Sequence, residues 1–152
     1  MKMHFRLLYV GFKIYCFIFR PVRMGVRVVM IQYDKVWLVR HTYLPGWFLP
    51  GGGLKRKETL EQAARREAFE ETGAELREIT LIGAYSNFKE WKTDHTIVFL
   101  CKDFNINGKT DGEIAEVRAF PLNTLPANVF SVHRRLIENY AQGKEQPLFG
   151  EW

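Results

Sequence analysis

The segment 50–73, PGGGLKRKETLEQAARREAFEETG, constrains the fold more than any other part of this 152-residue chain. Pro50 and the three glycines directly after it predict an irregular turn. Thr59 and Gln62 have the spacing of a capping box, in which each side chain binds the backbone of the other residue at the start of a helix. Gly73 is typical of a residue that ends a helix. The pattern therefore predicts a glycine turn followed by a helix over residues 59–72.

The predicted helix gathers three carboxylates on one side. At about 100° per residue, Glu67, Glu70 and Glu71 point in the same direction as a set of small or apolar residues. That set is Leu60, Ala63 and Ala64. Small residues let a helix lie close against a sheet, so we expect the three acids to be partly buried. Like charges in such a place repel and raise each other's pKa unless a cation compensates them.

Two interpretations of this acidic face remain open. Carboxylate oxygens are hard ligands that suit Mg²⁺ or Mn²⁺, so the face predicts a divalent cation site. The alternative is a solvated acidic face in which Arg65 and Arg66 are intrahelical partners. The histidines form no two-histidine motif on a helix, so we do not expect imidazole ligands. They are His4, His41, His95 and His133.

The rest of the chain predicts one mixed domain. Runs of β-branched and aromatic residues predict strands, and the first two flank Tyr33-Asp34-Lys35 as a hairpin. The predicted strands are 26–32, 36–41, 78–85, 96–104 and 117–120, and a last helix is expected over 132–142, before Gly143. Because strands outnumber helices and include a hairpin, we expect an α/β fold (α+β, with a mixed sheet) in which helices lie against the sheet.

Composition excludes several classes of protein. A hydrophobic content of 47%, with 14% aromatic residues, supplies a core and excludes a disordered or collagen-like chain. Cys16 and Cys101 are too few and too far apart for a disulfide framework, and they suit a reducing compartment. We therefore predict a cytoplasmic protein.

The basic charge of the chain is confined to its start. The net charge is +5, yet the first 33 residues contain six basic groups and no acid, which leaves 16 basic against 17 acidic residues in the remainder. The basic groups are Lys2, Arg6, Lys13, Arg20, Arg23 and Arg27. The charge therefore says little about the ligand of the main domain, and a nucleic-acid partner is not expected from it.

The N-terminal segment predicts an amphipathic helix that ends before Pro21. Its apolar residues at three-and-four spacing are Phe5, Leu8, Tyr9, Phe12, Cys16 and Phe19. Its uncharged runs are too short for a membrane span or a secretory signal, which need roughly 18 and 7 apolar residues. The helix could pack on its own domain or on a second subunit as a homodimer, or it could lie on an anionic membrane surface.

A longer pattern within residues 52–74 resembles a known signature. Gly52, five residues, Glu58, seven residues and then REAFEETGA resembles the Nudix box over its full span, Gly52 to Ala74, with every fixed position filled. The resemblance to the Nudix hydrolase family covers about residues 25–142. It implies a sheet-and-helix sandwich, and we assign this hydrolase domain to residues 25–152. The N-terminal helical extension over residues 1–24 is an addition that the resemblance does not imply.

The resemblance also implies site residues. Glu70 and Glu71 match the family's metal-ligating pair, Glu67 matches a further ligand and candidate base, and the Gly52 carbonyl matches a backbone ligand. Arg66 resembles the residue that orients these glutamates by charge-assisted bonds. Glu58 resembles a supporting position near the helix start. The cofactor expected is Mg²⁺, for which Mn²⁺ can substitute.

The implied reaction is metal-dependent hydrolysis of a nucleoside diphosphate linked to another moiety, by attack of water on phosphorus. Outside the box, Glu113 is the first candidate for the base, followed by Glu116 and Glu90. Arg40 is a candidate phosphate contact and Tyr85 a candidate base-stacking residue, each with an ordinary structural role as the alternative. Capped RNA is the one nucleic-acid substrate that stays open. The alternative function is that of a nucleotide-sensing module with little turnover. A third is that of a protein that acts mainly by binding a membrane surface through its N-terminal helix.

Overall fold

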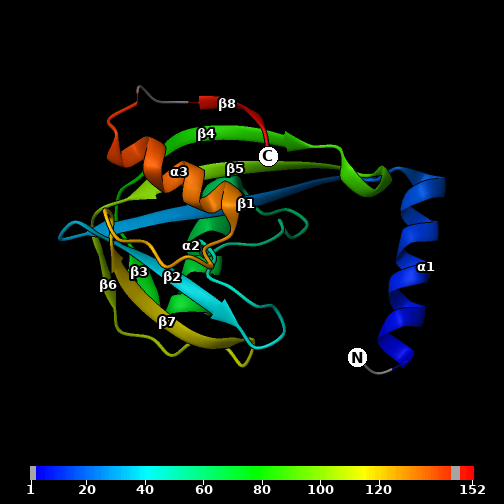
Figure 1. Ribbon diagram of the computed structural model, residues 1–152, viewed down its shortest axis with the longest axis horizontal. Helices are drawn as coiled ribbons and strands as arrows, with labels where there is room; N and C mark the ends of the chain where they lie inside the picture. The colour runs from blue at the N-terminus through cyan, green and yellow to red at the C-terminus, as the bar shows by residue number, and fades with distance from the viewer. Residues whose placement is uncertain (1–2, 145–147) are drawn as a thin grey trace.

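The computed structural model describes residues 3–144 and 148–152. Three helices, a short 3₁₀ turn and eight strands follow one another along the described chain (Figure 1). They are α1 (Met3–Phe19), β1 (Val22–Gln32), β2 (Lys35–His41), α2 (Leu60–Thr72), β3 (Ala74–Leu76), β4 (Ile79–Asn87), η1 (Lys89–Trp91), β5 (Thr93–Cys101), β6 (Phe104–Ile106), β7 (Ile114–Pro121), α3 (Ser131–Ala141) and β8 (Leu148–Glu151). The mixed α+β architecture confirms the predicted fold class.

The main sheet has six strands in the order β7-β2-β1-β5-β4-β8, and β3 pairs with β6 in a second sheet. It is mixed, because β1 runs parallel to β5 and β4 runs parallel to β8, while the other neighbours are antiparallel. The predicted hairpin is confirmed. Ile31 pairs with Val36, and both Tyr33 and Asp34 adopt positive φ in the turn between them.

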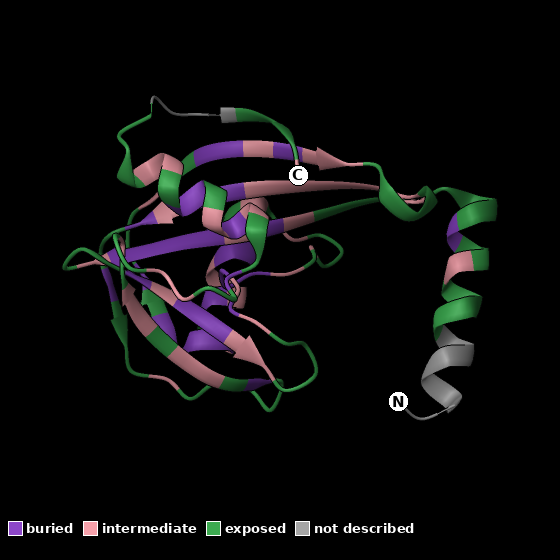
Figure 2. Cartoon of the chain, viewed as in Figure 1, coloured by how far each residue is buried: buried purple, intermediate pink, exposed green. Residues whose placement is uncertain are grey.

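Helices cover both faces of the main sheet. The alternation of side chains along β1 sends Val29 and Ile31 to a core shared with α3, and Val26, Val28 and Met30 to a core shared with α2. The α2 side is lined by alanines, which lets that helix lie close to β1 as expected. Figure 2 shows the buried residues along β1 between the two helices. A strand buried on both faces explains the long apolar run in this part of the sequence.

Helix α1 is present as predicted, but it does not lie on the sheet. It extends from the end of the molecule where η1 and the starts of β1 and β5 meet (Figure 1). Within residues 9–19 only Cys16 is buried; Tyr9, Phe12 and Phe19 of the predicted stripe are exposed, and the side chains of Phe5 and Leu8 lie outside the described residues. No helix in the described ranges 3–144 and 148–152 is long and apolar enough to cross a membrane.

The strand predicted over 96–104 needs two corrections. The single strand expected over 96–104 is two strands, because a turn at Lys102 and Asp103 sends β6 away to pair with β3. Strand β5 also begins earlier, at Thr93, where the polar residues Thr93–His95 pair through their backbone with β1.

Candidate active site

The glycine turn lies in a gap between two strands. Strands β1 and β2 pair only beside their hairpin, at Ile31–Val36 and Gln32–Lys35. Beyond it the chain around residues 48–54 takes the place between them: Phe48 exchanges backbone hydrogen bonds with Val39 of β2, while the Pro50 and Gly52 carbonyls accept from Val28 and Val26 of β1, each at 2.9 Å. The turn is thereby held by the sheet itself.

At two of its glycines the neighbouring atoms lie so close that a Cβ would force something to shift. Gly51 has φ +140°, and a Cβ at this position would collide with the Val26 carbonyl oxygen. A Cβ at Gly52 would lie 2.7 Å from both carboxylate oxygens of Glu67. The glycine turn and helix α2 therefore touch at the acidic residues, with no room for a side chain between them.

Helix α2 has the ends that the sequence predicts. Thr59 is the N-cap, and its hydroxyl accepts from the Gln62 N–H at 3.1 Å while the Gln62 side chain accepts from the Thr59 N–H at 2.9 Å. Gly73 ends the helix in the left-handed conformation, with φ 71°. The caps set where the helix begins and ends, and its face toward the glycine turn carries the carboxylate cluster Glu67, Glu70 and Glu71.

Glu71 is the most enclosed member of the cluster. Its side chain is 10% exposed, and its Oε2 accepts a hydrogen bond of 2.8 Å from the Gly51 N–H. Burial raises the pKa of Glu71 to about 7, with Glu67 and Asp111 adding to the rise and the Gly51 N–H and Arg27 opposing it. His41 lies on the other side, with Nε2 4.0 Å from Glu71 Oε1.

Arg66 connects the acids to one another. Its guanidinium donates to Glu58 at 2.6 and 2.9 Å, to Glu67 at 2.5 Å, to Glu70 at 3.0 Å and to the Gly53 carbonyl at 3.1 Å. The hydrogen bond from Arg66 lowers the pKa of Glu58 to about 2. Arg66 contacts the acids, as the resemblance implies, and does not lie free on the surface. Glu58, near the start of the helix, binds it with two hydrogen bonds.

Residues of this site fit a hard divalent cation in their chemistry. The cluster supplies oxygen donors only, and Oε1 of Glu71 lies 4.0 Å from Nε2 of His41, whose pKa burial lowers. Within residues 3–144 and 148–152, however, no three acidic, histidine or cysteine side chains converge as a ready site, because Glu67 and Glu70 turn toward Arg66. Arg66 Nη1 binds one oxygen of each of these two carboxylates, Oε1 of Glu67 and Oε2 of Glu70.

The other predicted residues lie in different surroundings. Arg40 on β2 pairs with Glu116 of β7 at 3.0 Å, so both are engaged with each other at the edge of the sheet. Tyr85 is 7% exposed and belongs to the core beside α3. Glu90 lies in η1, where its carboxylate accepts from the Tyr9 hydroxyl at 2.9 Å. The roles of Arg40, Tyr85, Glu116 and Glu90 in the reaction stay predictions.

Glu113 lies in a loop that is bound to α2. The Asp111 N–H donates to the Glu70 carbonyl at 2.8 Å, and the N–H groups of Asn107 and Gly108 donate to the Gly73 carbonyl at 3.1 and 2.9 Å. The exposed Glu113 affects two neighbouring side chains. The pKa of Tyr43 is raised first by the burial of Tyr43 and then by the negative charge of Glu113. The same charge opposes the fall in the pKa of His41 that burial causes. Its role as base stays a prediction.

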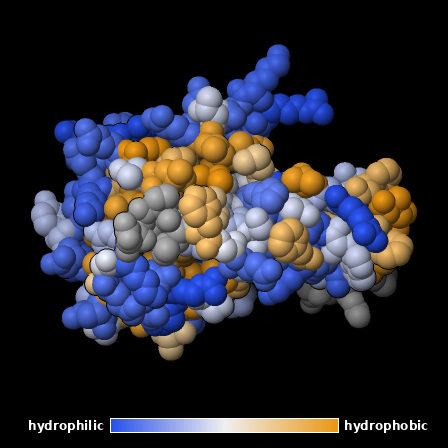
Figure 3. Space-filling model, turned by 90° about the horizontal axis from the view of Figure 1, so that it is seen from above, coloured by the Kyte–Doolittle hydropathy of each residue, from blue (hydrophilic) through white to orange (hydrophobic). Residues whose placement is uncertain are grey.

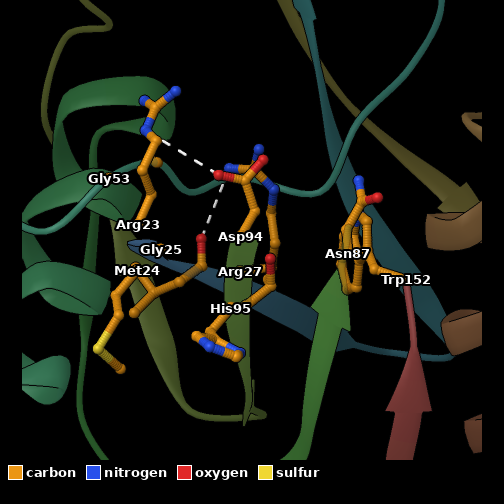
Figure 4. Close-up of a pocket in the computed structure, with 12 residues that line it drawn as sticks. Arg23, Met24, Gly25, Arg27, Gly53, Asn87, Asp94, His95 and Trp152 are labelled. Carbon is orange, nitrogen blue, oxygen red and sulfur yellow. Dashed lines mark hydrogen bonds and ion pairs between the residues drawn. The ribbon is translucent and has the colours of Figure 1, made fainter. Parts of the chain in front are cut away.

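A pocket of about 220 Å³ opens beside the glycine turn (Figure 4). It is bordered by β1, β5, the end of β4 and the C-terminal residue Trp152, and includes the backbone of Gly52 and Gly53. Asn87, Asp94 and His95 are among its polar lining residues. The pocket therefore adjoins the turn that touches the carboxylate cluster.

Arg27 is the site residue that sequence reasoning overlooked. It lines the pocket, and its enclosed Nε has no hydrogen-bond partner among the described residues. Burial lowers its pKa, and the charges of Glu71 and Glu67 oppose that fall. The signal was present in the sequence, because Arg27 interrupts a β-branched run, and a charge in a strand buried on both faces needs a specific partner.

The comparisons with known proteins agree with this arrangement. A family model described as NUDIX domain matches residues 21–140, most of the chain. The chain belongs to the Nudix family. It is 34% identical over 126 residues to the ADP-ribose pyrophosphatase of Methanocaldococcus jannaschii, covering 80% of this chain and 74% of that protein. It is 25% identical over 148 residues to the RNA pyrophosphohydrolase of Erwinia tasmaniensis, covering 81% and 83%.

Solved structures agree on the fold. A Nudix hydrolase from Nitrosomonas europaea has a TM-score of 0.68 and 27% identity, and the match covers 86% of this chain and 78% of that one. The predictions of a Nudix hydrolase and of a pyrophosphohydrolase acting on nucleoside diphosphate derivatives are thereby confirmed. Nudix hydrolases generally need divalent cations.

Proposed function

We propose that this Nudix chain hydrolyses the pyrophosphate bond of a nucleoside diphosphate linked to a second moiety, with Mg²⁺, or Mn²⁺ in its place, as the cation. The observation that carries the proposal is the contact between Gly52 and Glu67 beside the buried Glu71, which gives α2 a compact, oxygen-only face next to a pocket. When bound, the cation supplies charge neutralisation and a water of lowered pKa.

Each residue of the cluster has a distinct part in this proposal. Glu70 and Glu71 hold the cation, with Glu67 and the Gly52 carbonyl as further oxygen donors. That carbonyl also accepts from the Val26 N–H, so one of its lone pairs is already used. Arg66 positions the carboxylates through its bonds to them. Proton removal from the attacking water falls to Glu67 or to Glu113.

Arg27 fits the phosphate of the substrate. It lines the pocket, the charges of Glu71 and Glu67 oppose the fall of its pKa on burial, and its Nε is unpaired among the described residues. An enclosed donor that meets an anionic oxygen makes a strong, charge-assisted bond. We therefore place the pyrophosphate beside Arg27, with the nucleoside or its partner moiety in the pocket near Trp152.

A substrate screen tests the proposal. The named relatives act on ADP-ribose and RNA, so ADP-ribose, nucleotide sugars, dinucleoside polyphosphates, nucleoside triphosphates and capped RNA form the panel. Hydrolysis is measured with Mg²⁺ or Mn²⁺ as phosphate release after phosphatase treatment.

The decisive variant is Glu71→Gln, with Glu75→Gln as its matched control, because Glu75 is an exposed acid on β3. We expect Glu71→Gln to lower kcat by about a hundredfold or more and Glu75→Gln to leave it near wild type. Wild-type turnover in Glu71→Gln would show that the cation does not bind at this cluster. Nucleotide binding without cleavage of any substrate would favour the sensing module instead.

The remaining predictions concern location and partners. We propose a cytoplasmic protein, in keeping with the free, buried Cys16 and Cys101. Residues 1–24 are proposed as an extension separate from the hydrolase domain, in contact with a membrane surface or with a second copy of the chain. The exposed apolar side chains of α1 support a partner of one of these two kinds.

A further inference from the structure

Helix α1 has two unlike sides. At about 100° per residue, the described side chains of residues 9–19 divide into two half-circumferences. One half faces η1: the Tyr9 hydroxyl donates to Glu90 at 2.9 Å, the ring of Phe17 meets Trp91 edge-on at 5.6 Å, and Cys16 is buried. The helix is thus held against the rest of the molecule by one side only.

The other half is an apolar arc with no partner in the described chain. It is formed by Val10, Ile14, Tyr15, Ile18 and Phe19, which are between 48% and 66% exposed. Exposed Phe88 and Trp91 lie at the same end of the molecule, and Figure 3 shows apolar side chains gathered there. Contiguous apolar surface of this kind marks an interaction site rather than ordinary solvated surface.

Cations stand at the end of this arc. Arg20 directly follows the helix and is exposed, and the Arg23 side chain is 54% exposed. Of the acids at this end, Asp94 lies 4.0 Å from Arg23 and 3.3 Å from Lys92, and Glu90 is paired with Lys92, so two acids stand against Arg20, Arg23 and Lys92. The partner must therefore accept apolar and aromatic groups and carry negative charge next to them.

A second copy of the chain fits these demands poorly. In a two-fold dimer whose axis passes beside α1, each arc would meet the same segment of its partner, and the first 33 residues hold six basic groups and no acid. Such pairing brings like charges together. An anionic bilayer offers hydrocarbon for the arc, headgroup phosphates for the arginines and an interface in which tyrosine and tryptophan are favoured.

We propose that α1 docks this protein on the surface of an anionic membrane, with the arc of Val10, Ile14, Tyr15, Ile18 and Phe19 in the interface and Arg20 and Arg23 at the phosphates. This goes beyond hydrolysis, because it assigns a place and a partner to a helix that takes no part in the carboxylate cluster.

Vesicle sedimentation tests the proposal with the full chain and no nucleotide, so its outcome is independent of hydrolysis. Vesicles of phosphatidylcholine alone are compared with vesicles of phosphatidylcholine and phosphatidylglycerol. We expect binding to the anionic vesicles that is several-fold stronger than to the neutral ones and that falls as salt is raised.

Ile14→Glu combined with Ile18→Glu places two acids on the arc without disturbing the core. The matched control is Tyr33→Glu, at an 88% exposed position in the hairpin turn. We expect the double variant to lose about tenfold or more in vesicle partitioning, and the control to bind as the wild type does. Equal thermal melting of the three proteins shows that each is folded.

Three outcomes would overturn the proposal. One is failure of the wild type to bind either vesicle, and another is unchanged binding by the double variant. The third is a lipid-free wild-type dimer in sedimentation velocity that the double variant splits into monomers, since a second copy would then be what covers the arc.

Discussion

At the scale of single residues, the site depends on how an excess of negative charge is distributed. Arg66 shares its donors among Glu58, Glu67 and Glu70, whereas Glu71 is stabilised mainly by a backbone N–H of the glycine turn. The cluster thus has one acid that is enclosed and poorly neutralised and two that Arg66 holds. A cation that binds the cluster therefore contacts acids that Arg66 already holds in place. For this reason we expect Arg66 to position the carboxylates rather than to touch the substrate.

Gly52→Ala should impair catalysis more than folding. The new Cβ would press on the Glu67 carboxylate, which is the end of a flexible side chain and can move aside. We expect kcat to fall by about tenfold or more, with a small change in the free energy of unfolding. Gly53→Ala is the control, because its Cβ would have its nearest neighbour, the Met24 carbonyl, at 4.0 Å. Equal loss of kcat in the two variants would contradict the steric argument.

Arg27→Gln should weaken substrate binding while the carboxylates still bind the cation. We expect KM to rise about tenfold or more and the affinity for inorganic pyrophosphate to fall in parallel, both relative to Arg77→Gln, which removes an exposed charge elsewhere. Calorimetry of Mg²⁺ or Mn²⁺ in the absence of substrate provides the second measurement. If Arg27→Gln changes cation affinity and leaves pyrophosphate affinity as it was, Arg27 serves the carboxylates and not the phosphate.

At the scale of elements, local chemistry decided what could be predicted. Helix α2 was predictable at both ends because a capping box and a left-handed glycine are signals contained in a few neighbouring residues. The short strands β3 and β8 gave no usable periodicity, and they exist because their backbones meet other strands. The same reason explains the polar start of β5. The wheel also predicted the inward acids, whereas it could not show that Arg66 would draw Glu67 and Glu70 toward itself.

Thr59→Ala should destabilise the protein by about 1 kcal/mol, because the N-cap loses the hydroxyl that accepts from the Gln62 N–H. Urea unfolding measures the change. Thr59→Ser keeps the hydroxyl and should recover most of the lost stability. Should serine be as destabilising as alanine, the cap contributes through the threonine methyl and not through its hydrogen bond.

At the scale of the whole molecule, two buried groups give stability opposite dependences on pH. His133 is 1% exposed and its Nδ1 accepts from the Leu49 N–H at 3.0 Å, so burial holds its pKa well below 6.5. The unfolded chain therefore takes up a proton that the folded protein refuses, and stability falls below about pH 6.5. Glu71 has the opposite effect. Its pKa in the folded, cation-free protein is about 7, so as pH falls the folded protein binds this proton before the unfolded chain does, and this stabilises the fold.

We therefore expect Glu71→Gln to lose stability more steeply than the wild type between about pH 7 and about pH 5. In His133→Gln the free energy of unfolding should fall less over the same range, because the proton uptake that favours unfolding is removed. Urea unfolding of the cation-free proteins at several pH values gives both slopes. Parallel curves for all three proteins would show that neither group titrates differently in the folded and unfolded states.

The bonds between α2 and the loop that carries Glu113 have a dynamic consequence. The amides of Asn107, Gly108 and Asp111 cap the carboxyl end of this helix. Breathing of the loop must therefore uncap the helix, and the two should exchange their amide hydrogens with solvent as one cooperative unit. A ligand that brings Glu113 inward would slow exchange along the last turn of α2 as well, so its arrival could be followed by deuterium uptake at amides it never touches.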